Sequence, residues 1–114
     1  MQMRFANSCE ETKQMNTEQL RENFLVDSLM QDDKLNLVYS HYDRVIIGGA
    51  KPVSKKLQLE THPELKAGYF LERREIGIIN VGGDGIIEAD GKKFSPNKFD
   101  CVYLGKGTKK VSFA

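Results

Sequence analysis

The stretch from Ile76 to Lys110 decides the fold, and it reads IGIINVGGDG IIEADGKKFS PNKFDCVYLG KGTKK. Short apolar runs alternate in it with clusters of glycine, asparagine, aspartate and proline, which is typical of strands joined by tight turns. The pair Asp90-Gly91 stands between two such runs and predicts a two-residue hairpin, because a type I′ turn needs positive φ at both central residues. The stretch therefore predicts β-structure built from short strands.

The same period-two pattern extends back along the chain to residue 35. Short strands at intervals of about ten residues indicate an all-β sandwich or barrel. The predicted strands cover residues 35–40, 44–47, 57–59, 76–81, 86–88, 92–94, 101–104 and 109–113.

One helix is predicted before the strands. Asn16 and Gln19 have the spacing of a capping box, in which the two side chains satisfy each other's backbone N–H groups. Leu20 and Phe24 lie four residues apart and form one apolar stripe. We expect this helix to end by residues 26–27.

Composition excludes several classes of protein. The 114 residues include 17 basic and 16 acidic side chains, so the net charge is only +1 and no basic excess indicates nucleic acid binding. No apolar run approaches the length needed to cross a bilayer, and the first residues lack the apolar core of a signal peptide. We expect a cytoplasmic protein with two free thiols, Cys9 and Cys101, of which Cys101 is expected to be a small buried hydrophobe.

The order of glycines and acidic residues between positions 75 and 107 resembles the paired motifs of cupin barrels. Glu75 stands at the position of the family's metal-binding glutamate, and Gly82 follows at the expected spacing. Asp100 begins the second motif, Gly105 replaces its proline, and Gly107 matches its glycine. The resemblance implies a double-stranded β-helix, or jelly-roll barrel, whose metal ion is held by three histidines and one glutamate.

The metal ligands of this motif are missing from the chain. The position of the last histidine holds Lys110, and the positions of the first two hold Tyr69 and Leu71 or, with the longer spacing, Gly68 and Phe70. A single carboxylate cannot replace the nitrogen and oxygen ligands that zinc, manganese or iron require. We therefore expect no metal and no cofactor in this chain.

Glu75 and Lys110 are the two charged residues left in the degenerate cupin site. We predict that they form an ion pair in place of the metal. The alternative is that one or both side chains turn to solvent, because desolvation can cancel the Coulomb gain of a buried pair.

Longer stretches carry a more specific resemblance. Residues 20–26, 38–49, 69–83 and 104–107 resemble the N-terminal part of bacterial 5-keto-4-deoxyuronate isomerases, also called 4-deoxy-L-threo-5-hexosulose-uronate ketol-isomerases. The resemblance implies aldose–ketose isomerisation of a deoxyuronate in pectin degradation. It also implies two cupin-like halves, a hexameric assembly, and one zinc ion per subunit held by the second half.

This chain contains two histidines and cannot supply that zinc site. We expect residues 1–34 to form an N-terminal arm and helix, and residues 35–114 to form a cupin-like barrel truncated before the metal-binding half. Such a chain has no catalytic residue of its own, is inactive alone, and is expected to be part of a homo-oligomer. The alternative is a free-standing, non-catalytic cupin-like module for binding or assembly.

Two polar segments admit both a functional and a structural interpretation. Arg44 could bind a uronate carboxylate through its paired guanidinium N–H groups, with His41 as a proton carrier. We favour a structural corner at residues 41–44 instead. The segment Gly105–Lys110 lacks the spacing of a phosphate-binding loop and is predicted to be a β-turn with solvated lysines.

Overall fold

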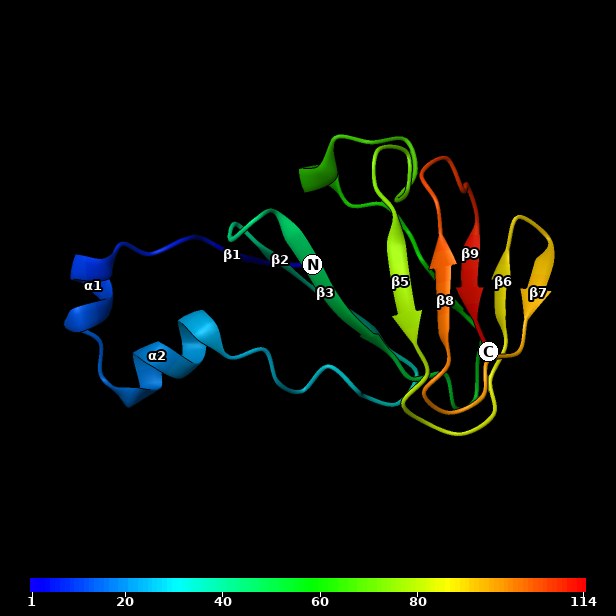
Figure 1. Ribbon diagram of the computed structural model, residues 1–114, viewed down its shortest axis with the longest axis horizontal. Coiled ribbons are helices and arrows are strands. Elements are labelled where there is room, and N and C mark those ends of the chain that lie inside the picture. The colour runs from blue at the N-terminus through cyan, green and yellow to red at the C-terminus, as the bar shows by residue number, and fades with distance from the viewer.

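The computed structural model describes all 114 residues, and its nine strands form three separate sheets (Figure 1). The first sheet contains β1 (Gln2–Arg4), β2 (Leu35–Ser40) and β3 (Val45–Ala50) in that order. The second has the order β4 (Leu57–Gln58), β9 (Val111–Phe113), β6 (Ile87–Ala89) and β7 (Lys92–Phe94). The third pairs β5 (Ile76–Ile79) with β8 (Cys101–Leu104). The helices are α1 (Cys9–Lys13), α2 (Thr17–Phe24) and the 3-10 helix η1 (Pro63–Leu65).

The β-rich class predicted from the sequence is confirmed, and the strands do not close into a barrel. Three sheets with open edges replace the continuous ring that a barrel needs, because β3 pairs only with β2 and β5 pairs only with β8. The predicted bounds of β2, β7 and β8 are correct.

The hairpin predicted at Asp90-Gly91 is confirmed. Both residues have positive φ, 47° and 84°, and they connect Ala89 directly to its partner Lys92. The Asp90 carboxylate also accepts hydrogen bonds from the backbone N–H groups of Lys109 and Lys110. These bonds fix the hairpin against the start of β9.

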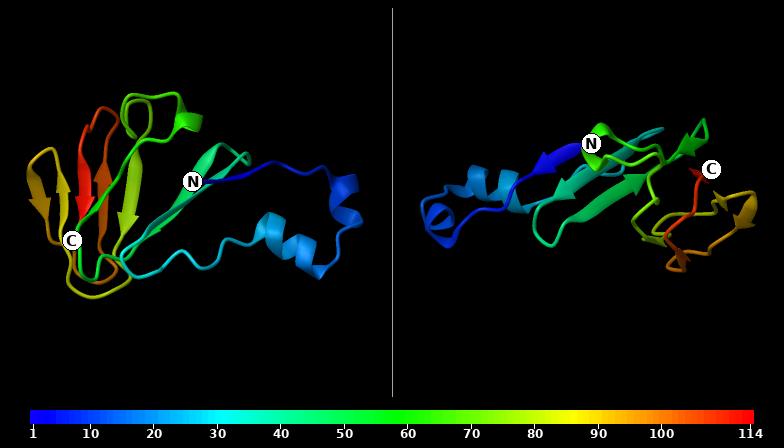
Figure 2. Two further views of the ribbon diagram at one scale, coloured as in Figure 1. Left: turned by 180° about the vertical axis from the view of Figure 1, so that it is seen from behind. Right: turned by 90° about the horizontal axis from the view of Figure 1, so that it is seen from above.

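The predicted helix is α2. Asn16 and Gln19 form the capping box, with 2.9 Å bonds in both directions, and the helix ends at Phe24. The shorter α1 was not predicted, although Ser8 and Glu11 form a second capping box with the same spacing. The helices extend away from the sheets in both further views (Figure 2).

The N-terminal arm returns to the first sheet. β1 runs parallel to β2, and the link from α2 back to β2 passes over the sheet at Leu29, whose carbonyl accepts a 2.9 Å bond from the Asn36 side chain. The division into an arm of residues 1–34 and a barrel of residues 35–114 stays a prediction.

Gly48 and Gly49 do not end β3, contrary to the prediction that the apolar run stops at residue 47. A Cβ atom on Gly48 would lie 2.5 Å from the Leu37 Cδ2 atom, so the Leu37 side chain lies directly over this glycine. A Cβ atom on Gly49 would lie 2.8–3.0 Å from the Cβ, oxygen and carbonyl carbon of Leu29. The glycines therefore continue the strand and let two other segments approach its backbone closely.

We predict that Gly49→Ala destabilises the fold by about 1–3 kcal/mol, because the Leu29 backbone must move to admit the methyl group. The control is Gly77→Ala in β5, where no atom lies within 4 Å of the added Cβ. Urea unfolding of both variants measures the difference. Equal midpoints for the two variants would contradict the close approach at Gly49.

The apolar core joins side chains from all three sheets, and Leu71, with 1% of its surface exposed, is its most buried member. The Leu71 carbonyl accepts a 2.7 Å bond from Gly107, which ties this segment to the turn after β8. Cys101 is exposed, so its predicted burial is wrong. The alternation of β8 points Val102 and Leu104 inward and leaves Cys101 on the outer face with Tyr103.

We expect Leu71→Ala to lower the free energy of unfolding by about 2–5 kcal/mol, through lost burial and the cavity left behind. Leu20→Ala on α2 is the comparison, since 38% of Leu20 is exposed. Denaturant unfolding followed by circular dichroism reports both values. A loss at Leu71 no larger than the loss at Leu20 would refute this assignment of the core.

Candidate functional site

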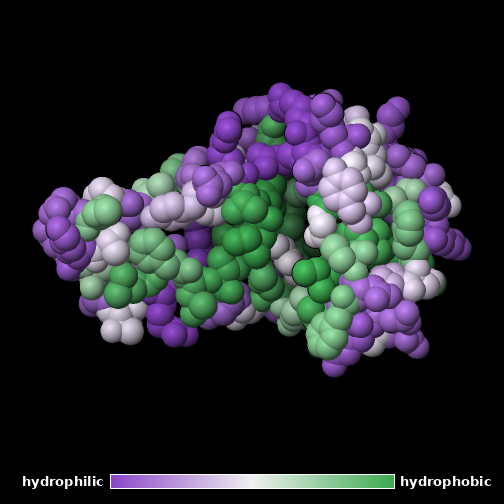
Figure 3. Space-filling view, viewed as in Figure 1, coloured by the Kyte–Doolittle hydropathy of each residue, from purple (hydrophilic) through white to green (hydrophobic).

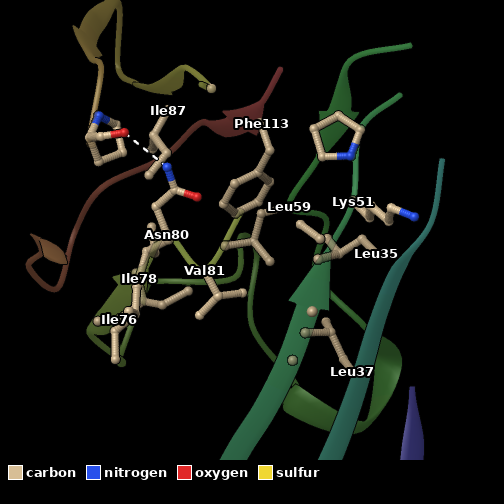
Figure 4. Close-up of a pocket in the computed structure, with 18 of the residues that line it drawn as sticks. Leu35, Leu37, Lys51, Leu59, Ile76, Ile78, Asn80, Val81, Ile87 and Phe113 are labelled. Carbon is tan, nitrogen blue, oxygen red and sulfur yellow. Dashed lines mark hydrogen bonds between the residues drawn. The ribbon is translucent and has the colours of Figure 1, made fainter. Parts of the chain in front are cut away.

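An open cleft of about 880 Å³ separates β3 from β5 (Figure 4). One wall comes from the first sheet, with Leu35 and Leu37 of β2 facing the cleft. The other comes from β5 and the loop after it. Leu59, Ile87 and Phe113 lie at the inner end. The cleft is predominantly apolar, and Figure 3 shows hydrophobic residues gathered around a hollow in the same region.

Asn80 shapes the loop that forms one rim of the cleft. Its amide nitrogen donates to the carbonyls of Gly83 and Pro96, at 2.8 and 2.9 Å, and its amide oxygen accepts from the Gly82 N–H at 3.0 Å. One side chain therefore supports the tight turn at residues 81–85 and ties it to the segment before β8. Val81 and Ile86 stand on this rim with about half of their surfaces exposed.

Asp33 fixes the opposite rim, where Val53 lines the cleft. Its carboxylate accepts bonds from the Ser54 hydroxyl and from the backbone N–H groups of Val53 and Ser54, both at 2.8 Å. The Ser54 hydroxyl, followed by the two backbone bonds, holds the pKa of Asp33 well below its usual range. The charged carboxylate accepts these bonds more strongly than the protonated acid does, so protonation of Asp33 weakens the bonds at this rim.

A carboxyl group whose pKa is lowered in the folded state contributes to folding stability. That contribution is complete above the ordinary carboxyl pKa of about 4, and it is lost as the pH falls through the pKa of the folded state. We therefore predict that the amide proton shifts of Val53 and Ser54 titrate with a midpoint well below 4. Asp33→Asn should abolish this titration. It should leave in place the titration of the Lys109 and Lys110 amide protons, which donate to the Asp90 carboxylate. NMR titration measures it, and an ordinary midpoint near 4 would contradict the bonding described.

Charged side chains gather at one end of the cleft, where it is lined by Asp43, Arg44, Arg74 and Glu75. Arg74 donates to the Arg44 carbonyl at 3.0 Å, and its guanidinium carbon lies 5.2 Å from the centre of the Tyr39 ring. Arg74 is therefore occupied in holding the β2–β3 turn against the start of β5.

The predicted ion pair between Glu75 and Lys110 is not formed. Glu75 instead accepts a 2.6 Å bond from the Tyr103 hydroxyl, which raises the pKa of Tyr103. The four ion pairs of the structure involve other residues. The separation has a topological cause, because Glu75 precedes a strand of the third sheet and Lys110 precedes β9 of the second.

The structural interpretation of residues 41–44 is supported. These residues form the turn between β2 and β3, with positive φ at Asp43 and Arg44. The His41 ring stacks on Phe5, with the ring centres 4.6 Å apart, and is not among the residues lining the cleft. Arg44 does line the cleft, so the structure does not bring His41 and Arg44 into one site.

No group of three or more His, Cys, Asp and Glu side chains is arranged to hold a metal ion. His62 precedes η1, far along the chain from the stacked His41, and both cysteines are free and exposed. The residues of this chain therefore do not fit the zinc site implied by the resemblance. The location of that zinc in another part of a longer protein stays a prediction.

Comparison with known proteins confirms the resemblance. The chain is 52% identical over 111 residues to the 4-deoxy-L-threo-5-hexosulose-uronate ketol-isomerase of Formosa agariphila. It is 47% identical to that of Halalkalibacterium halodurans and 49% identical to that of Caldicellulosiruptor bescii, each over 113 residues. The chain is similar to one part of these ketol-isomerases.

The matches cover 97–99% of this chain and 40–41% of the relatives. The chain thus spans about two fifths of the length of the ketol-isomerases that it matches. No protein-family model matches it. None of its helices combines the length and the apolar character needed to cross a membrane.

The cleft itself was not predicted from the sequence. Its walls come from segments about 30 residues apart, and period-two patterns do not reveal which sheets pack together. One signal was available: Val53 is an apolar residue in a segment between two predicted strands, where solvated side chains are expected.

Proposed function

We propose that this chain is a non-catalytic, β-rich part of a 4-deoxy-L-threo-5-hexosulose-uronate ketol-isomerase. The whole enzyme would interconvert aldose and ketose forms of a deoxyuronate during pectin degradation. The observation that carries the proposal is the 47–52% identity to enzymes of that name over nearly the entire chain.

The chemistry would lie outside these 114 residues. The resemblance implies a zinc ion held by residues outside this chain, and that ion would supply Lewis-acid chemistry to the whole enzyme. This chain lacks a matching set of metal ligands, so its own residues would have a structural role in the enzyme. Asn80 and Asp33 would hold the two rims of the cleft, and Arg74 would brace its charged end.

The finer features of the proposal follow from the resemblance. A cupin-like jelly roll would be completed by further strands from the longer polypeptide. The enzyme would be cytoplasmic, would assemble as a hexamer, and would bind a deoxyuronate rather than nucleic acid or membrane. The open edges of β3 and β5 support the first of these features, because a closed barrel needs strands at both positions.

A second candidate is a non-catalytic module for binding or assembly, which the apolar character of the cleft favours. Sugars are bound chiefly through hydrogen-bonding groups, and most of this cleft offers alkyl side chains. The two candidates differ in whether the chain completes an active enzyme.

Reconstitution distinguishes them. The unmatched 60% of the Formosa agariphila relative, here called the complementary segment, is expressed as a separate polypeptide and mixed with this chain, zinc and the deoxyuronate. We expect ketol-isomerase turnover from the mixture and none from this chain with zinc.

The complementary segment alone is the control, and its activity should lie well below that of the mixture. Turnover by this chain alone would overturn the non-catalytic assignment. A mixture no more active than the complementary segment would favour the binding module.

A further inference from the structure

The cleft leaves large apolar side chains exposed to solvent. Only 14 of the 114 residues are buried. Large apolar side chains on the cleft rims are widely exposed: Val53 by 63%, Val81 by 52%, Met30 by 49% and Ile86 by 43%. A contiguous apolar patch rimmed by polar residues is characteristic of an interaction site.

The total surface of the chain is larger than that of a compact monomer of the same mass. A compact monomer of 12.9 kDa exposes about 6,300 Å², whereas this chain exposes 7,879 Å². Its radius of gyration is 15.7 Å, where about 13 Å is typical of 114 residues. The excess of about 1,600 Å² is shared between the protruding helical arm and the open cleft.

The walls of the cleft also carry unpaired backbone groups. The outer edge of β3 has no strand beside it, and neither does the outer edge of β5. The backbone hydrogen bonds outside the regular ladders include none from residues 45–50 or 76–79. Two open strand edges beside one apolar cleft are suited to an added strand, which satisfies backbone groups and buries alternate side chains together.

We infer that an extended segment of the ketol-isomerase polypeptide, from the part outside these 114 residues, enters the cleft and adds strands to β3 and β5. This inference rests on the proposed function, and it identifies which polypeptide segment would fill the cleft. The relatives carry the additional chain that this requires, since the match covers about 40% of their length. Ala114 lines the same cleft and forms two backbone hydrogen bonds with Ile86, at 2.7 and 2.9 Å.

A second copy of this chain fits the cleft less well. A two-fold interface brings the same surface of each copy together, and two concave clefts cannot fill each other. The protruding arm exposes Phe24 and Leu25, but the backbone inside α2 is already paired. The link after α2 is bonded to the first sheet, at the Leu25 carbonyl by the Arg4 side chain and at the Leu29 carbonyl by the Asn36 side chain.

Binding of the complementary segment tests the inference. Amide hydrogen exchange of this chain is measured with and without the segment, and added protection is expected within residues 45–50 and 76–79. Ile86→Asp, which places a charge in the cleft, should weaken binding by about tenfold or more. Leu20→Asp on α2 is the matched control, because Leu20 is 38% exposed and does not line the cleft. It should leave the affinity nearly unchanged, and circular dichroism checks that both variants fold.

Several outcomes would overturn the inference. They are failure to bind, binding without protection of β3 and β5, equal effects of the two aspartate variants, and protection of both edges through self-association of this chain. Turnover in the mixture without edge protection would leave the proposed function standing and reject the strand addition. Protection of both edges without turnover would support the strand addition and reject the proposed function.

Discussion

The dominant constraint on this molecule is that the first and third sheets lie on either side of an apolar cleft. Each sheet has an unpaired strand edge there, β3 in the first and β5 in the third. The short strands pair locally, as β6 with β7 and β5 with β8, but no strand connects β3 to β5. Leu59 and Phe113 lie at the inner end of the cleft, and the cleft stays open between its rims. The turns and polar contacts around the cleft hold its shape without filling it.

This constraint explains why a chain related to an enzyme carries no recognisable catalytic arrangement. Two of the charged residues that line the cleft are engaged in structure: Arg74 bonds the Arg44 carbonyl, and Glu75 bonds Tyr103. Its two histidines lie apart, one stacked on Phe5 and the other preceding a 3-10 helix. The chain's contribution to a ketol-isomerase, as proposed here, is a scaffold with a surface that further polypeptide completes.

Local structure was predictable where a short motif has a strong physical cause. Asp90-Gly91 specified its turn through positive φ, and Asn16 with Gln19 specified the start of α2. Long-range features were not predictable, because they depend on which segments approach each other. Gly48 looked like the end of a strand, but it is a site where Leu37 packs. Spacing placed Glu75 and Lys110 at two ligand positions of the cupin motif, whereas Glu75 has Tyr103 as its partner in the structure.

The family resemblance was predictable from the sequence because long stretches of unusual composition carry it, and the comparisons confirm it. The jelly-roll barrel rests on the same resemblance, but the observed sheets remain open. The central claim is that residues from the longer enzyme occupy the cleft as strands. A crystal structure of this chain bound to the complementary segment tests it most directly. We predict an extended segment hydrogen-bonded to β3 and β5. A solvent-filled cleft, or one filled by the helical arm of another copy, would contradict the account.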